Sequence, residues 1–159
     1  MNYSQKWSIV CFIETVIEGD EFTMQNWPLH TTLADVFAVD MNQQVLDDIQ
    51  KIFTEFKGIE TNAIGERTFG DAEHLVNVVL LENTSMLQTC HDTFIDMLTK
   101  HGAVFNNPEF THEGFIPHTK IQNERRLQIG DTVKLENLAI IDMFTNSDWQ
   151  QRKILKLYT

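Results

Sequence analysis

Two short stretches place a histidine two residues before a side chain that can donate a hydrogen bond. "HTTL" at residues 30–33 contains His30 and Thr32, and "PHTKI" at residues 117–121 contains His118 and Lys120. An imidazole can act as acid or base near neutral pH, because its unperturbed pKa is about 6.5. A hydroxyl or an ammonium group can hold an anionic oxygen. Two such pairs would supply two proton transfers and two phosphate contacts, which is what metal-free cleavage of a phosphodiester requires.

Each pair acts together only if its stretch forms a β-strand. Side chains on a strand alternate between faces, so His30 and Thr32 point the same way, about 7 Å apart along the strand. The apolar Leu29 and Leu33 then face the core. In the second stretch the same alternation sends Thr119 to the face opposite the histidine. The donor two residues after that histidine is therefore the lysine and not this threonine.

The pattern of apolar residues predicts an α+β protein. Strands are expected over 6–15, 28–39, 59–70, 74–82, 115–122, 135–144 and 152–159. Helices are expected over 40–58 and 84–102, the first capped by Asp40 or Asn42 and ended by Gly58. Met86 is placed on the apolar face of the second helix, and residues 18–22 and 106–114 are expected to be loops. The two halves of the chain thus have similar element orders without being sequence repeats.

The two histidine stretches, 88 positions apart between their histidines, resemble the paired HxT/S motifs of the 2H phosphoesterase superfamily. That superfamily includes LigT-like 2′-5′ RNA ligases, cyclic phosphodiesterases and 2′-5′ oligoadenylate phosphodiesterases. "RTFG" before "HLVNVVLL" and the tail "LENLAIIDMF…WQQRKILKLY" also resemble its middle strands and last hairpin. The resemblance covers nearly the whole chain.

The resemblance implies one domain, residues 1–159, with two pseudo-symmetric lobes. Each lobe would contribute an antiparallel sheet to a central cleft, with helices packed outside. It also implies metal-independent hydrolysis of a phosphodiester in a small nucleotide or short oligonucleotide. Candidate substrates are a 2′,3′-cyclic phosphate, a 2′-5′ linkage or a cyclic oligonucleotide signal. Some phage-encoded members degrade such signals in bacterial immunity.

Carried over by position, His30, Thr32 and His118 match the family's catalytic residues, whereas Lys120 stands where the family has threonine or serine. The lysine can contact phosphate as a charged donor, or it can mark a degenerate half-site. Two alternatives therefore remain: a nucleotide-binding module without turnover, and a metal-dependent hydrolase in which His112 and a carboxylate join the two motif histidines.

Other residues are candidates for substrate contacts. Arg67 is a basic residue expected near a phosphate, and Trp27, Phe69 and Phe115 flank the histidine strands, where they can stack on a base. A third HxT sequence begins at His91, but it lies in the second predicted helix, where positions i and i+2 do not share a face. The remaining histidines have ordinary explanations as loop or element-end residues: His74, His101 and His112.

Composition limits the class of partner. The chain has 12 Lys+Arg and 23 Asp+Glu, a formal net charge of −11, which argues against tight binding to long nucleic acids. Cys11 and Cys90 lie in apolar patterns and are expected to be buried and reduced. No signal peptide or membrane span is recognisable. We expect a soluble, cytoplasmic monomer that needs no cofactor or metal.

Overall fold

The computed structural model describes residues 5–70, 72–122 and 124–159. Helix α1 spans Gln43–Phe56 and helix α2 spans Ser85–Lys100. Strands account for most of the remaining regular structure. They are β1 (Trp7–Phe12), β2 (Glu21–Thr23), β3 (His30–Ala38), β4 (Glu60–Phe69), β5 (Val76–Leu81), β6 (Val104–Phe105), β7 (His118–Lys120), β8 (Thr132–Lys134), β9 (Leu138–Asp142) and β10 (Gln151–Tyr158). Short 3-10 helices occur at Pro108–Phe110 (η1), His112–Gly114 (η2) and Thr145–Ser147 (η3).

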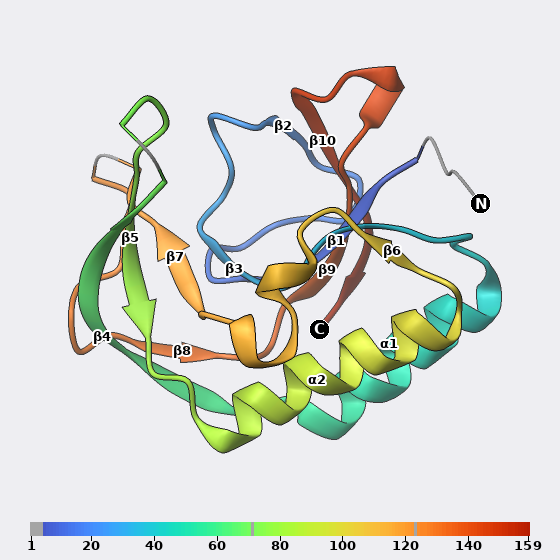
Figure 1. Cartoon of the computed structure of the whole chain (residues 1–159), viewed down its shortest axis with the longest axis horizontal. Coiled ribbons are helices and arrows are strands. Elements are labelled where there is room, and N and C mark those ends of the chain that lie inside the picture. Colours follow the sequence, from blue (N-terminus) through green and yellow to red (C-terminus); the bar gives the residue numbers. More distant parts are fainter. Residues whose placement is uncertain (1–4, 71, 123) are drawn as a thin grey trace.

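The strands of the described residues form one antiparallel sheet in the order β2-β10-β9-β1-β3-β7-β5-β4-β8, with β6 paired to the end of β3. The sheet curls into an open half-barrel (Figure 1). The α+β class is confirmed, but the strands do not form the two separate sheets expected. Strands β2, β10, β9, β1 and β3 form one arm of this sheet, and β7, β5, β4 and β8 form the other. The two arms are joined where Thr31 of β3 pairs with Thr119 of β7. The histidine strands are therefore neighbours in one sheet.

Both helices begin at a capping residue, and the cap of α1 is one of the two candidates predicted from the sequence. The Asn42 side chain accepts a hydrogen bond from Val45 N at 3.1 Å, and Thr84 accepts one from Leu87 N at 3.1 Å. Each bond satisfies one of the free N–H groups at a helix start. Met86 differs from expectation, because its side chain is 50% exposed. The next residue, Leu87, is rotated by about 100° around the helix and takes the core-facing position instead.

The main core lies between the two helices and one face of β1, β3 and β9. Leu33 and Phe37 of β3 are part of it, together with Phe94 of α2. Figure 1 shows α1 and α2 side by side along this face of the sheet. Because burial of Leu33 fixes which face of β3 meets the helices, the other face is left for His30 and Thr32.

Three of the four shortest strands of the described residues, β2, β6 and β8, were not predicted from the sequence. Residues 21–23 pair with β10 although 18–22 was expected to be a loop, and β6 and β8 contain two and three residues. In so few residues an alternating pattern cannot be distinguished from chance. Among the described residues, no helix is both long and apolar enough to cross a membrane.

Candidate active site

The alternation predicted for the first histidine strand is confirmed. Thr31 and Leu33 of β3 are 4% and 1% exposed, whereas His30 and Thr32 are half-buried on the opposite face. On β7, Thr119 is fully buried, while His118 is half-buried and Lys120 exposed. Each histidine therefore shares a face with the donor two residues later.

The pairing of β3 with β7 arranges these four side chains around a local two-fold axis. Thr31 lies opposite Thr119, so the antiparallel register places His30 across from Lys120 and Thr32 across from His118. The axis relates one histidine to the other, and Thr32 to Lys120. The two histidines are diagonal neighbours, a relation that corresponds to roughly 7–8 Å. That separation is between backbone positions, and both imidazoles project from them on the same face of the sheet.

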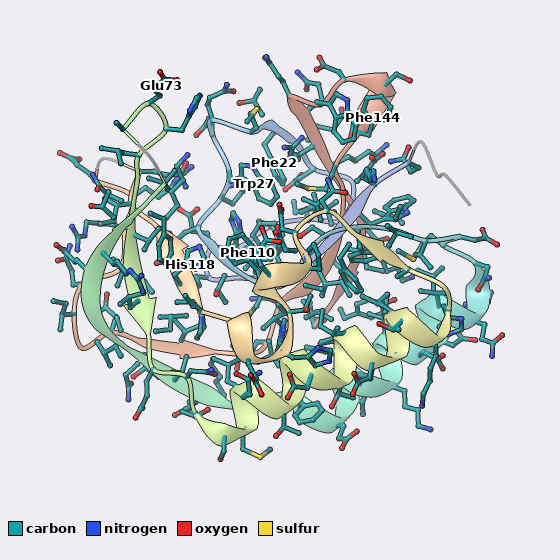
Figure 2. All side chains as sticks on the ribbon, viewed as in Figure 1. Phe22, Trp27, Glu73, Phe110, His118 and Phe144 are labelled. Carbon is teal, nitrogen blue, oxygen red and sulfur yellow. The ribbon has the colours of Figure 1, made fainter. Side chains whose placement is uncertain are left out.

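All four side chains line one small cavity of about 190 Å³. Trp27 and Val76 form part of its apolar wall. Figure 2 shows Trp27 and His118 pointing into the centre of the molecule, between the two arms of the sheet. The sequence motifs are thus brought together at one place, which we name the histidine cavity.

Each imidazole is anchored by a backbone carbonyl two residues earlier. His30 Nδ1 lies 2.8 Å from Pro28 O, and His118 Nδ1 lies 2.7 Å from Ile116 O. A carbonyl oxygen only accepts, so in each ring Nδ1 carries the hydrogen and donates it. In the neutral ring, the lone pair for proton transfer is therefore on Nε2.

The two histidines have charged neighbours that act on their pKa values in opposite directions. Burial lowers the pKa of His30 from 6.5 to about 4, and the positive charges of His118 and Lys120 add to this shift against the opposing hydrogen bond to Pro28. Burial also lowers the pKa of His118, but its hydrogen bond to Ile116 and the negative charge of Asp35 act in the opposite direction. His30 thus has a cation as its charged neighbour, and His118 has a carboxylate.

Aromatic rings pack against both histidines. Trp27 stacks on His30 with ring centroids 4.2 Å apart and planes at 28°, and the Arg152 guanidinium lies 5.7 Å from the Trp27 ring centre. Phe69 meets His118 edge to face, with centroids 5.0 Å apart. The candidate aromatic residues Trp27 and Phe69 therefore orient the imidazoles, whatever contact they make with a ligand.

A larger cavity of about 530 Å³ adjoins the first and shares Thr32, Val76 and His118 with it. We name it the aromatic cavity. Its lining includes three of the residues proposed from the sequence: Arg67, Phe69 and Phe115. The Arg67 guanidinium lies 5.0 Å from the ring centre of Phe69. Phe115 is 8% exposed, and its ring stacks on His91 at 4.0 Å.

The remaining histidines have structural partners. His91 of α2 lines the aromatic cavity, but both ring nitrogens are occupied: Nδ1 lies 2.6 Å from Leu33 O, and Nε2 accepts from His112 N at 3.0 Å. His112 Nε2 lies 2.8 Å from Asp96, and His101 lies 2.7 Å from Asp48. His112 is therefore paired away from the two motif histidines, and the convergence needed by the metal-dependent alternative is not seen in the described residues.

Sequence reasoning missed several residues of the aromatic cavity, among them Asp35 and Phe110, whose side chains could contact a ligand. Phe110 belongs to η1 in a segment expected to be a loop. Asp35 follows one irregularity in the pairing of β3 with β1, between Thr32 and Ala34, and lies within a second, between Ala34 and Phe37. Bulges of this kind redirect side chains, so counting by twos from Thr32 could not have placed Asp35.

Comparison with known proteins finds a solved structure with a similar fold. No family model matches the chain, and no curated protein matches it in sequence. The fold is similar to that of a solved structure described as the crystal structure of a phosphoesterase. The two chains share 11% sequence identity, the match covers 97% of each, and the TM-score is 0.54. Over nearly its whole length, this chain therefore has a phosphoesterase-like fold.

Proposed function

We propose that this protein is a metal-independent phosphodiesterase of the 2H type. The observation that carries the proposal is the placing of two anchored imidazoles, one from each arm of the sheet, in one cavity with a hydroxyl and an ammonium group. The likeness of fold to a phosphoesterase supports it. The substrate is a small nucleotide or short oligonucleotide that contains a 2′,3′-cyclic phosphate, a 2′-5′ linkage or a cyclic phosphodiester.

In the proposed reaction His30 is the general base and His118 the general acid. His30 Nε2 takes the proton of the attacking hydroxyl, whose oxygen forms a bond to phosphorus. As the bond from phosphorus to the leaving oxygen breaks, His118 Nε2–H gives its proton to that oxygen. Thr32 and Lys120 donate hydrogen bonds to the non-bridging oxygens, where negative charge concentrates.

The charged neighbours support this assignment of roles. Burial lowers the pKa of His30 to about 4, with smaller contributions from the charges of His118 and Lys120, so His30 is neutral and ready to accept a proton at pH 7. Asp35 favours the protonated form of His118, and an anionic phosphate beside that ring has the same effect. Lys120 thus stabilises the phosphate and also keeps the base deprotonated.

The position of Lys120 also favours a second candidate function. If the exchange of a hydroxyl for an ammonium group has abolished turnover, the same cavity holds a nucleotide without cleaving it. A tight complex from which the nucleotide is recovered unchanged would identify this binding module.

A substrate panel tests the proposal directly. The protein is incubated with 2′,3′-cyclic mononucleotides, 2′-5′-linked dinucleotides and 3′,5′-cyclic dinucleotides, with and without excess chelator, and the products are separated by chromatography. We expect hydrolysis of at least one class at a rate that the chelator does not change. Loss of activity with chelator, restored by added metal, would favour a metal-dependent hydrolase.

The proposed roles predict an acidic pH optimum. Activity is lost as the pH falls through the pKa of His30, about 4, because the base becomes protonated. It is also lost as the pH rises through the pKa of His118, which lies below 6.5, because the acid becomes deprotonated. We therefore expect a bell-shaped profile of kcat/KM, which reports the free enzyme, with its maximum between these limits. A maximum above pH 7 would contradict the assignment.

A further inference from the structure

We propose that the aromatic cavity is a guanine-selective base subsite and that Asp35 is its selecting residue. This inference rests on the proposed function, because it places the phosphodiester of the same nucleotide in the histidine cavity. Thr32 and His118 line both cavities, so one ligand can span them. The volume of about 530 Å³ lies within the range of small-molecule sites, about 300–1,000 Å³.

The hydrogen bonding of Asp35 leaves it able to bind a ligand. Asn107 Nδ2 donates to Asp35 Oδ2 at 2.9 Å, and no other hydrogen bond to this carboxylate is found among the described residues. An ionised carboxylate has about four acceptor positions and no donor. Asn107 thus orients the carboxylate while most of its acceptor capacity remains unused on the wall of the cavity.

The charge of Asp35 determines which part of a nucleotide can lie beside it. A phosphate is excluded by like-charge repulsion, and a bare apolar ring would leave the carboxylate unpaired. A group with N–H donors meets both conditions. The Watson–Crick edge of guanine presents two adjacent donors, N1–H and the 2-amino group, which match the two oxygens of a carboxylate. Adenine and cytosine present one amino group beside an acceptor nitrogen, which would face the second oxygen unfavourably.

Other residues of the aromatic cavity can contact the flat face of a purine and a second phosphate. Phe110 is 51% exposed and lines the cavity, so it offers an uncovered ring on which a base can stack. Figure 2 shows Phe110 and His118 close to the centre of the molecule, and both line the aromatic cavity. Arg67, exposed on β4, supplies a positive charge for a neighbouring phosphate of the ligand.

Binding of unreactive nucleotides tests the subsite without requiring turnover. Calorimetry is performed with 5′-GMP, 5′-IMP, which lacks the 2-amino group, and 5′-AMP. Hydrogen bonds to a charged group contribute more than bonds between neutral groups. We therefore expect 5′-GMP to bind at least about tenfold more tightly than 5′-AMP, with the affinity of 5′-IMP between the two. Equal affinities, or no measurable binding of any of the three at millimolar concentration, would overturn the proposal.

Two variants separate selection from general binding. Asp35→Asn keeps the shape but replaces one acceptor by a donor, and we expect the preference for 5′-GMP to fall below about threefold. Phe110→Ala is expected to weaken the binding of all three nucleotides by about tenfold and to keep their order of affinity. Asp47→Asn, at an exposed position of α1, is the matched control and should leave all affinities unchanged. Thermal melting verifies that each variant is folded.

Turnover distinguishes failure of the subsite from failure of the proposed function. The ratio of kcat/KM for 2′,3′-cyclic GMP over 2′,3′-cyclic AMP should exceed about ten in the native protein and collapse in Asp35→Asn. A purely electrostatic effect of Asp35 on His118 would change both rates and leave the ratio intact. Equal rates for the two substrates would refute the subsite while the phosphodiesterase stands. Asp35-dependent binding of 5′-GMP without turnover of any nucleotide would refute the enzyme and keep the subsite.

Discussion

Replacing His30 or His118 with alanine is expected to lower kcat by about 10²–10⁴, because each substitution removes one of two required proton transfers. Steady-state kinetics on the substrate identified by the panel measures the effect. KM should change much less than kcat, since Thr32 and Lys120 still hold the phosphate. The double variant should be little worse than either single variant, because residues that act as a unit are not additive.

The matched control for both histidine variants is His101→Ala. His101 lies at the end of α2 and contacts Asp48, and it lines neither the histidine cavity nor the aromatic cavity. Its replacement should leave kcat within about a factor of two. Near-native hydrolysis by both His30→Ala and His118→Ala would remove the two-histidine mechanism. Loss of thermal stability in either variant would require the more conservative His→Gln replacement before the rates are interpreted.

The faces of the histidine strands could be predicted because one face of each strand is buried. A slip of one residue in β3 would expose Leu33 and bury His30, and that cost fixes the register. The helices could be predicted for a similar reason, because each has an apolar stripe, and for α1 the capping residue Asn42 agrees with it. These are local patterns that a single sequence records.

Features that depend on pairing between distant segments could not be predicted. The join at Thr31 and Thr119 makes one sheet from the two that were expected, and a threonine in a strand is too common to mark such a join. The course of β3 beyond Thr32 depends on irregular pairing with β1, which brings Asp35 to the aromatic cavity. Asp35 therefore belongs to the candidate site because of an irregularity in strand pairing, which the composition of the sequence does not reveal.

Under the proposed two-histidine mechanism, a lysine at position 120 has an explanation in the geometry of the pair. An exact two-fold arrangement would give both histidines the same surroundings, although base and acid need opposite protonation states. The cation at Lys120 lies across from His30, and the carboxylate of Asp35 acts on His118. The two rings are thereby made unequal before any substrate binds.

Lys120→Met should lower kcat/KM by about 10²–10³, the usual effect of removing one donor to a developing negative charge. Lys120→Thr retains a donor and should lose less. In both variants the pKa of His30 should rise, because a nearby positive charge that disfavours its protonation is gone. The acidic limb of the kcat/KM profile should therefore move to higher pH in both, while Lys51→Met on the exposed side of α1 leaves it in place.

The comparison of these two variants also decides between an enzyme and a degenerate half-site. If Lys120 is part of the catalytic apparatus, Lys120→Thr is slower than the native protein and has a shifted acidic limb. If the lysine marks lost chemistry, Lys120→Thr restores the family's second donor and is faster. A gain of tenfold or more would make the native protein the binding module. A loss accompanied by the pH shift is the result expected if the ammonium group acts on the phosphate and on His30 together.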